Sequence, residues 1–322
     1  MKFTMESIYL DINDETERLS AALKDAVAFK LKKRGAVVGV SGWIDSSVVL
    51  ALCAKTFGSE KVFAIMMPER DSSPESKELA AELCEKFKVP YILEDITDAV
   101  NGFGCYRRRD EAVKRVFPEY DPKTYKMKIV LKDDKEAIGK LNLFYLTIIA
   151  PDGTQKSQRL PLSEYLQIVA ASNFKQRSRT NMLYYHAEAK NYAVIGTGNK
   201  NEHEQGFFVK YGDGGADIKP IAHLFKTQVY QLAKHLGVPE DIIKRTPTTD
   251  TYSAEQTQEE FFYKMPFEIM DRIWDGWEKG VSSDEIASVL NLSKTQVDVM
   301  INDLRQKIQT TEYLRQEPLS LG

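Results

Sequence analysis

The segment SGWIDSS, residues 41–47, carries the sharpest chemical signal in this sequence of 322 residues. It lies between a short apolar run, residues 36–41, and a longer apolar helical stretch, so we expect a junction between strand and helix. The free N–H groups and the positive dipole end of a helix stabilise an anion there. The segment lacks the Gly-Lys-Ser/Thr ending of the Walker A loop, which argues against γ-phosphate transfer. Asp45 is suited to hold Mg²⁺ against phosphates, and the alternative is an ordinary helix N-cap.

A second group of charged and polar residues occurs in the Gly-rich stretch GTGNKNEHEQGFFVKYGDGGAD and after it. A polar loop directly after a strand of an α/β sheet lies where substrates bind. Mixed acids and bases at that place serve Mg²⁺, phosphates and proton transfer. The alternative is a solvated surface loop with incidental charges. The candidate residues are Thr197, Glu202, Lys210, Asp213 and Asp217, followed by Lys226 and Thr248.

The elements that must position these residues alternate between strands and helices. An amphipathic helix is predicted over residues 12–34, and the chain then continues as strand, helix, strand, helix, strand to residue 95. Each strand has the length and the apolar character of a strand in a parallel sheet. A helix over 173–191 and a strand over 192–199 resume this pattern. We therefore predict a doubly wound, mostly parallel α/β fold.

Two regions depart from that alternation. Residues 102–168 contain a basic helical stretch and segments that alternate like hairpin strands around a turn at 151–153, so we expect an inserted β-rich arm. Residues 257–322 return to helix and include a stretch similar to a helix-turn-helix, whose one base, Lys294, faces several acids. This charge pattern does not favour DNA binding. We expect a single domain over 1–322 that includes the arm and the C-terminal helical segment.

Composition narrows the class of protein. Lys and Arg number 44 against 47 Asp and Glu, and the resulting net charge of −3 does not favour nucleic acid as a partner. No apolar run approaches the roughly 20 residues needed to span a bilayer, and the N-terminus has no signal core, so we expect no membrane association. Three cysteines without metal-ligand spacing indicate a reducing cytoplasm and no metal centre other than magnesium.

Six motifs occur in an order that resembles the ammonia-dependent NAD synthetase family of the PP-loop ATP pyrophosphatases. They are GVSGWIDSS, NFKQRSR, GTGNKNE, GFFVKYGDGGADIKPI, KTQVYQLAKHLGVPEDII and PTTD. The resemblance covers most of the chain except the arm. It implies an adenine-nucleotide α-hydrolase-like fold, a homodimer and a carbon–nitrogen ligase. Such a ligase adenylates the carboxylate of deamido-NAD with Mg-ATP, releases pyrophosphate, and lets ammonia displace AMP to give NAD.

The resemblance also implies roles for individual residues. By this resemblance, the pyrophosphate of ATP is bound by the loop Gly39, Val40, Ser41, Gly42, Trp43, Ile44, Asp45 and Ser46. Further contacts with ATP fall to Thr197, Lys226 and Thr248, and the magnesium carboxylates are Asp45 and Glu202. By the same resemblance, deamido-NAD is bound by Arg177, Lys210 and Asp217. Asp213 is the candidate for orienting or deprotonating ammonium, and the expected catalytic set is Asp45, Glu202, Lys226 and Asp213.

Two departures from the family pattern keep alternatives open. Trp43 stands where the family has a second glycine, and we expect its ring to reshape the phosphate loop. Tyr313 and Leu314 stand where the family has a His-Lys pair that contacts the dinucleotide. The arm's arginines 107, 108 and 109 are candidates to replace that pair. The alternatives are amidation of a different carboxylate or a degenerate homologue that binds nucleotide without turnover. No glutaminase domain is expected, so ammonia is free or delivered by another protein.

Overall fold

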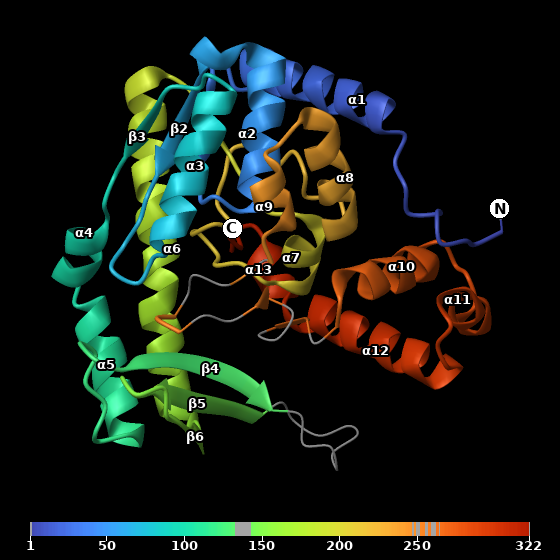
Figure 1. The fold of residues 1–322 in the computed structure, drawn as a ribbon. Coiled ribbons are helices and arrows are strands. Elements are labelled where there is room, and N and C mark those ends of the chain that lie inside the picture. Colours follow the sequence, from blue (N-terminus) through green and yellow to red (C-terminus); the bar gives the residue numbers. More distant parts are fainter. Residues whose placement is uncertain are drawn as a thin grey trace.

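A four-stranded parallel sheet forms the centre of the protein (Figure 1). The computed structural model describes residues 2–132, 143–246, 248, 252–254, 257–258, 262–263 and 265–321. The strand order is β3-β2-β1-β7, and the strands are β1 (Ala36–Gly39), β2 (Val62–Met66), β3 (Tyr91–Leu93) and β7 (Ala193–Ile195). The sheet and the helices that connect its strands confirm the predicted α/β fold.

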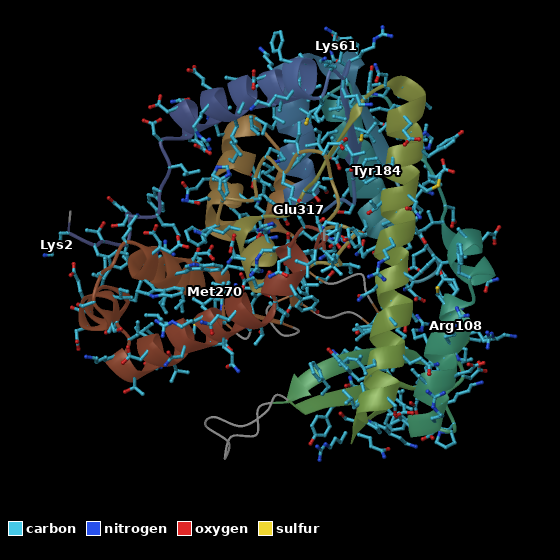
Figure 2. The ribbon with its side chains drawn as sticks, turned by 180° about the vertical axis from the view of Figure 1, so that it is seen from behind. Lys2, Lys61, Arg108, Tyr184, Met270 and Glu317 are labelled. Carbon is cyan, nitrogen blue, oxygen red and sulfur yellow. The ribbon has the colours of Figure 1, made fainter. Side chains whose placement is uncertain are left out.

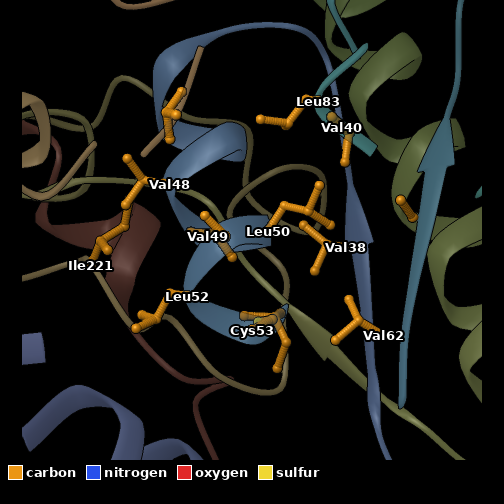
Figure 3. Packing of buried hydrophobic residues seen from close by; sticks show 14 of the residues in the cluster. Val38, Val40, Val48, Val49, Leu50, Leu52, Cys53, Val62, Leu83 and Ile221 are labelled. Atoms are coloured by element: carbon orange, nitrogen blue, oxygen red, sulfur yellow. The ribbon is translucent and has the colours of Figure 1, made fainter. Parts of the chain in front are cut away.

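Helices cover both faces of the sheet, because successive side chains of each strand point to opposite sides. Val38 and Ala64 pack into a cluster with helices of one face, whereas Val37 and Ile65 pack with the opposite face. Figure 3 shows this packing of α2 against β1. The first face carries α1 (Ile12–Asp25), α2 (Ile44–Phe57), α3 (Pro74–Lys86) and α8 (Lys226–Leu236). The second carries α6 (Leu162–Lys190).

Shorter elements complete this part of the chain. A π-helical turn, η1 (Ala26–Lys30), extends α1, so the helix predicted over 12–34 ends a few residues early. A 3-10 turn, η2 (Ser59–Lys61), leads into β2, and α9 (Glu240–Lys244) follows α8. The short helix α4 (Thr97–Gly102) follows β3, and α7 (Lys200–Gln205) follows β7.

The arm is a helix and a small antiparallel sheet at the lower end of α6 (Figure 1). It consists of α5 (Cys105–Val116), β4 (Lys126–Lys132), β5 (Leu143–Ile149) and β6 (Gln155–Arg159), with strand order β4-β5-β6. The predicted turn at 151–153 joins β5 to β6, and its Gly153 has a φ of 84°. Helix α6 begins at Leu162 rather than at the expected residue 173, so the end of the expected arm is helix.

A buried network of charges lies where the arm meets the central sheet. Arg109 on α5 is 2% exposed and binds Asp71 at 2.5 Å and Asp110 at 2.8 Å. Lys175 on α6 binds the same Asp71 at 2.7 Å and Glu69 at 3.0 Å. Burial favours the neutral form of Asp71, but Lys175 and Arg109 outweigh it and hold the pKa of this carboxyl well below its usual range. The network therefore ties α5 and α6 to the loop that follows β2.

Arg109 was one of three arm arginines considered as candidates to replace the lost cationic pair, but its guanidinium is bound within this buried network. The other two lie on the outer side of α5, where Figure 2 labels Arg108. Arg107 pairs with Glu111, and Arg108 donates to the carbonyl of Phe103. All three arginines thus have partners within the arm.

Four helices form the C-terminal part of the chain: α10 (Phe267–Glu278), α11 (Ser283–Leu290), α12 (Lys294–Thr310) and α13 (Glu312–Arg315). Trp274, Ile286 and Val297 pack together with Phe3 and Ile8 from the N-terminal segment. The C-terminus then returns to the middle of the molecule, where Figure 2 labels Glu317. In the described part of the chain, no helix combines the length and apolar character needed to cross a membrane.

We predict that Arg109→Ala lowers the free energy of unfolding by about 3 to 5 kcal/mol, because it removes a buried cation that pairs with both Asp71 and Asp110. Arg107→Ala removes an exposed charge from the same helix and provides the matched control, with an expected loss under about 1 kcal/mol. Urea unfolding of both variants measures the difference. Equal losses for the two variants would contradict a structural role of the network.

Candidate active site

Two loops meet beyond the carboxyl ends of β1 and β7. β1 leads into α2 on one face of the sheet, whereas β7 is reached through α6 on the other face, so the chain changes direction between these neighbouring strands. Such a switch point opens a crevice in which α/β proteins bind their ligands. The loop at residues 39–46 and the loop at 196–199 therefore lie side by side. A hydrogen bond of 2.8 Å from Asn199 Nδ2 to Asp45 Oδ1 joins them.

The first loop has the shape of an anion cradle at a helix N-terminus. Gly42 has a φ of 74°, and a methyl group there would collide with the carbonyl oxygen of Ser76, so only glycine fits. Ser46 Oγ lies 3.1 Å from Ser41 Oγ and donates to the carbonyl of Trp43 at 3.0 Å. These bonds keep the loop compact and leave its backbone close to the start of α2.

Trp43 adopts an ordinary backbone conformation despite standing where glycine was expected. Its φ of −103° and ψ of 158° are extended values that any residue adopts, so the backbone of the loop carries no strain there. Its ring lies 3.5 Å from the guanidinium carbon of Arg245, a cation–π contact. Arg245 in turn reaches Glu75 at 3.1 Å. The loop accommodates this ring through Arg245.

The other members of this loop contribute mainly through the backbone. The side chains of Val40 and Ile44 are 4% and 2% exposed and belong to the hydrophobic cluster around α2. Gly39 lies under Met67, whose methyl group would be 3.2 Å from an added methyl on this glycine. An anion at the start of α2 would therefore meet N–H groups and hydroxyls rather than these apolar side chains.

A buried ion pair joins the two helices that border the crevice. Lys226, the first residue of α8, is 1% exposed, and its Nζ lies 2.5 Å from Asp45 Oδ2 on α2. Burial works against the charged form of Lys226, yet Asp45 and Glu202 raise its pKa above the usual value. The ammonium therefore stays protonated and in place. A cation fixed beside a helix N-terminus suits a phosphate group.

Glu202 brings a second carboxylate to the same place. It is the third residue of α7 and forms a capping box with Asn199, whose backbone N–H it accepts at 3.1 Å. Burial has the largest effect on the pKa of Glu202 and the charge of Asp45 the next largest. Together they raise this pKa to about 8, although Lys226 acts in the opposite direction. Two neighbouring carboxylates share one lysine, which leaves an excess of negative charge.

This donor set fits a magnesium ion held jointly with phosphates. A dication would relieve the excess charge on Asp45 and Glu202. Asp45 Oδ1 and Oδ2 and Glu202 Oε2 each retain a lone pair beyond the hydrogen bond that they accept. Mg²⁺ in nucleotide sites takes one or two carboxylates together with phosphate oxygens and water. The described residues contain no cluster of three or more His, Cys, Asp or Glu side chains placed for a metal ion. An all-protein metal cage is therefore not part of the described structure.

Two residues that the sequence analysis did not identify, Asn201 and Asp271, support the start of α8. Asp271 on α10 is fully buried and accepts hydrogen bonds from Asn201 Nδ2 at 2.5 Å and from Thr227 N at 2.9 Å. Asn201 Oδ1 accepts the N–H of Lys226 at 2.9 Å. The side chains of Asn201 and Asp271 thus cap the first turn of α8. Burial raises the pKa of Asp271 to about 6, although the hydrogen bonds from Thr227 and Asn201 lower it.

The remaining ATP candidates, Thr197 and Thr248, and the ammonium candidate Asp213 lie outside the long helices and the central strands. Thr197 is half-buried between β7 and α7. Thr248 is half-buried and forms an antiparallel bridge with Thr257, whereas the rest of the PTTD motif lies outside the described residues. Asp213 is exposed and accepts the N–H of Val209 at 2.8 Å. Its charge is close enough to raise the pKa of Glu202, after the larger effects of burial and of Asp45.

The three candidates for dinucleotide binding lie on α6 and on the Gly-rich loop. Arg177 Nε donates to the carbonyl of Lys210 at 3.3 Å, so these two residues are neighbours. Asp217 accepts the N–H of Val194 on β7 at 2.8 Å and the hydroxyl of Tyr184 at 3.2 Å. Asp217 therefore also supports the end of the central sheet.

The C-terminal segment contacts this group in an unexpected way. Lys210 Nζ donates to the carbonyls of Tyr313 at 3.0 Å and Gln316 at 2.8 Å. Arg315 fixes the same segment to α7 by donating to the carbonyl of Glu204 at 2.7 Å. The segment that lacks the expected His-Lys pair thus supplies backbone carbonyls to Lys210.

We predict that the destabilisation caused by Glu202 grows with pH. The pKa of Glu202 is higher in the folded than in the unfolded state, so the folded state holds a proton that the unfolded state has lost. The free energy of unfolding therefore falls as the pH rises toward 8. In metal-free protein, the stability advantage of Glu202→Gln over the wild type should therefore increase by about 1 kcal/mol or more between pH 6 and pH 9. Urea unfolding at both pH values measures it.

Glu204→Gln is the matched control, because a hydrogen bond from His203 lowers the pKa of Glu204. Its stability relative to wild type should not improve over the same pH interval. Saturating Mg²⁺ should reduce the advantage of Glu202→Gln at pH 9. A constant difference at both pH values would contradict the strained carboxylate pair.

Comparisons with known proteins agree with this geometry. The family model described as NAD synthase matches residues 15–115 and 113–318. An NH(3)-dependent NAD(+) synthetase of Rhizobium meliloti is 46% identical over 316 residues, which cover 98% of this chain and 94% of the relative. Another, of Thermotoga maritima, is 36% identical over 270 residues, 84% of this chain and 89% of the relative.

Solved structures share the fold. The NMN synthetase of Francisella tularensis superposes with a TM-score of 0.66 at 23% identity, covering 97% of this chain and 98% of that one. The NH3-dependent NAD synthetase of Campylobacter jejuni, in complex with the nitrate ion, gives 0.62 at 23% identity, covering 97% and 100%. Together with the family match over nearly the whole sequence, these likenesses show that the chain belongs to the NAD synthase family.

Proposed function

We propose that this protein is an ATP-dependent amide synthetase that adenylates the carboxylate of deamido-NAD and transfers ammonia to it, giving NAD, AMP and pyrophosphate. The relatives that are 46% and 47% identical carry the name NH(3)-dependent NAD(+) synthetase, which supports this carbon–nitrogen ligase activity. The observation that carries the proposal is the buried pair of Lys226 and Asp45, joined by Glu202, at the N-terminus of α2.

In this proposal the pyrophosphate end of ATP lies in the loop at residues 39–46. The N-terminus of α2 and the ammonium of Lys226 stabilise the negative charge that develops when the bond between the α- and β-phosphates breaks. Asp45 and Glu202 would hold Mg²⁺, which supplies positive charge to the phosphate oxygens when bound. Thr197 and Thr248 contribute further contacts with ATP.

The dinucleotide and ammonia have their own residues in the proposal. Arg177 suits planar, bidentate recognition of an anionic group, and Lys210 beside it adds a point charge. Asp217 completes the substrate side of the crevice. Asp213, an exposed carboxylate in the same Gly-rich loop, orients ammonium or accepts its proton before the amine attacks the acyl adenylate.

The two alternatives from the sequence have less support. Amidation of a different carboxylate is not favoured, since the relatives with the highest identities given above are named as NAD synthetases. A degenerate homologue has no need of the Lys226 and Asp45 pair or of a strained second carboxylate, and Trp43 does not strain the loop backbone. Turnover is therefore the expected behaviour.

We also propose a homodimer, a single domain over 1–322 and a cytoplasmic location. Tyr185 on α6 is 62% exposed, which supports a contact with a second copy, although Met182 and Leu183 beside it pack partly against the sheet. The three cysteines are free and buried, as suits a reducing compartment.

We predict that turnover with ATP, Mg²⁺, deamido-NAD and ammonium forms AMP and pyrophosphate in equal amounts and no ADP. Glu202→Gln should lower kcat by about a hundredfold or more, because it removes a carboxylate that holds the stabilising cation. This variant keeps the Lys226 and Asp45 pair intact, so the fold is preserved. Quantitative nucleotide chromatography measures the products.

Asp98→Asn removes an exposed carboxylate on α4 and serves as the control, with kcat unchanged. Stoichiometric ADP from the wild type would contradict the adenylation mechanism. Loss of activity in Asp98→Asn as large as in Glu202→Gln would contradict the role of the second carboxylate.

We further predict that Asp271→Ala lowers kcat/KM for ATP by about tenfold or more. It removes two hydrogen bonds that hold Asn201 and the first turn of α8, and each such buried bond to a charge contributes about 1.5 to 3 kcal/mol. Asp275→Ala, one turn further along α10, removes a carboxylate that pairs with Lys279 and leaves α8 untouched. Initial rates at varied ATP separate the two variants, and equal effects would argue against capping by Asp271.

A further inference from the structure

The hydrophobic core of the arm contains one residue from far outside the arm region. Its buried members in the described chain lie between residues 112 and 168, with the exception of Tyr252. Tyr252 is 4% exposed and packs into a cluster that includes Met127, Ile129 and Leu146 of the arm sheet. A residue 125 positions after Met127 thus completes the core of this inserted region.

The next two residues bind the edge of the arm sheet. Met127 N on β4 donates to Ser253 Oγ at 2.9 Å, and Ala254 N donates to the carbonyl of Met127 at 3.1 Å. β4 is an edge strand of the order β4-β5-β6, so its outward backbone groups need a partner. Residues 252–254 provide that partner, with both a buried ring and backbone-directed hydrogen bonds.

These anchored residues lie between Thr248 and Thr257 in the sequence. Thr248 and Thr257 form an antiparallel bridge, which closes the loop at its base. Tyr252 follows Thr248 by four residues, so even an extended chain keeps the two within about 14 Å. The arm therefore fixes residues 252–254, and the bridge joins Thr248 to Thr257. We call the set Thr248, Tyr252–Ala254 and Thr257 the anchored loop.

We propose that the arm is a positioning device for ATP, and that Tyr252 is the positioning residue through which the arm holds the anchored loop. The inference rests on the proposed function, because the contact of Thr248 with ATP belongs to that function. Residues that are already held in place lose less conformational entropy when the nucleotide binds, so their anchor acts on affinity for ATP. Tyr252 itself lies in the core of the arm, so we expect the anchor to act on binding rather than on the bond-forming step.

A purely structural role for Tyr252 would give a different result. Filling the arm core alone would affect stability and leave affinity for ATP unchanged. The two roles are separated by comparing Tyr252→Ala with Phe144→Ala, which removes another ring of the same cluster. Phe144 stacks on Tyr165 and lies on β5, away from the edge that holds residues 253 and 254. Tyr252→Phe keeps the ring and tests rescue by a conservative change.

The experiment measures the Kd of Mg²⁺ with the α,β-methylene analogue of ATP by calorimetry, together with KM and kcat. We expect Tyr252→Ala to raise the Kd and the KM for ATP by about tenfold, because the loop must then be ordered at the expense of binding energy. The kcat at saturating ATP and the KM for deamido-NAD should stay within about twofold of wild type. Tyr252→Phe and Phe144→Ala should stay within about threefold in the Kd.

Amide hydrogen exchange provides a second measurement that does not depend on catalysis. In Tyr252→Ala the amide of Ala254, which donates to Met127, should exchange at least about tenfold faster, whereas amides of the central sheet keep their rates. If Tyr252→Ala fails to fold, Ser253→Ala, which removes only the acceptor of Met127 N, takes its place with the same expected direction.

Two outcomes overturn the proposal. An unchanged analogue Kd in a variant whose Ala254 amide exchanges faster would show that anchoring does not position ATP, even if the wild type synthesises NAD. An equal rise of Kd in Phe144→Ala would show a general effect of arm damage. Failure of the wild type to amidate deamido-NAD overturns the proposed function instead, and the analogue Kd still tests the anchored loop.

Discussion

The buried ion pair between Asp45 and Lys226 is the constraint on which the rest of the site depends. Its members belong to different helices, α2 and α8, and Asn199 connects the pair to the loop after β7. Two charges removed from water cost more than their attraction returns unless their geometry and additional hydrogen bonds are good. The three elements are therefore held in one arrangement, with the N-terminus of α2 open toward the crevice.

The same arrangement leaves one charge unsatisfied. Glu202 shares the crevice with Asp45, and a single lysine does not neutralise both carboxylates, which explains why the pKa of Glu202 lies so far above its usual value. The strain is local and faces the place where phosphates and a dication would lie. A bound dication would remove the repulsion between the two carboxylates, so the site gains affinity for a dication together with phosphates.

Supports for the site come from parts of the chain that do not line it. Asp271 on α10 caps α8 from behind, so the C-terminal helices help to place Lys226. The arm reaches the same region from the opposite side through Tyr252 and the edge of β4. The buried network around Arg109 and Lys175 holds the arm itself to the loop after β2. The supports of the candidate site thus come from distant segments, whereas the residues proposed for the chemistry lie at the switch point.

Local patterns were sufficient to predict much of this protein. The apolar runs around residues 36–41 and 192–199 identified the two strands whose loops form the site, and the motifs placed Asp45, Glu202 and Lys226 in it. The spacing of Asn199 and Glu202 is a capping-box signature that could also have been read. These features depend on neighbours within a few residues, which is why the sequence reveals them.

Other features depended on which distant surfaces meet. The partners Asp271 and Tyr252 carry no local signal, since an aspartate on an amphipathic helix and a tyrosine in a loop are common. Arg109 belonged to a basic run and was a candidate for contacting the dinucleotide, yet it is buried and paired with Asp71 and Asp110. The ring of Trp43 was expected to reshape the phosphate loop, but Trp43 has extended backbone angles, and the positive φ in this loop belongs to Gly42. Hydrophobic period and motif order fix the elements, whereas the pairing of buried charges and the filling of a core follow only from their packing in three dimensions.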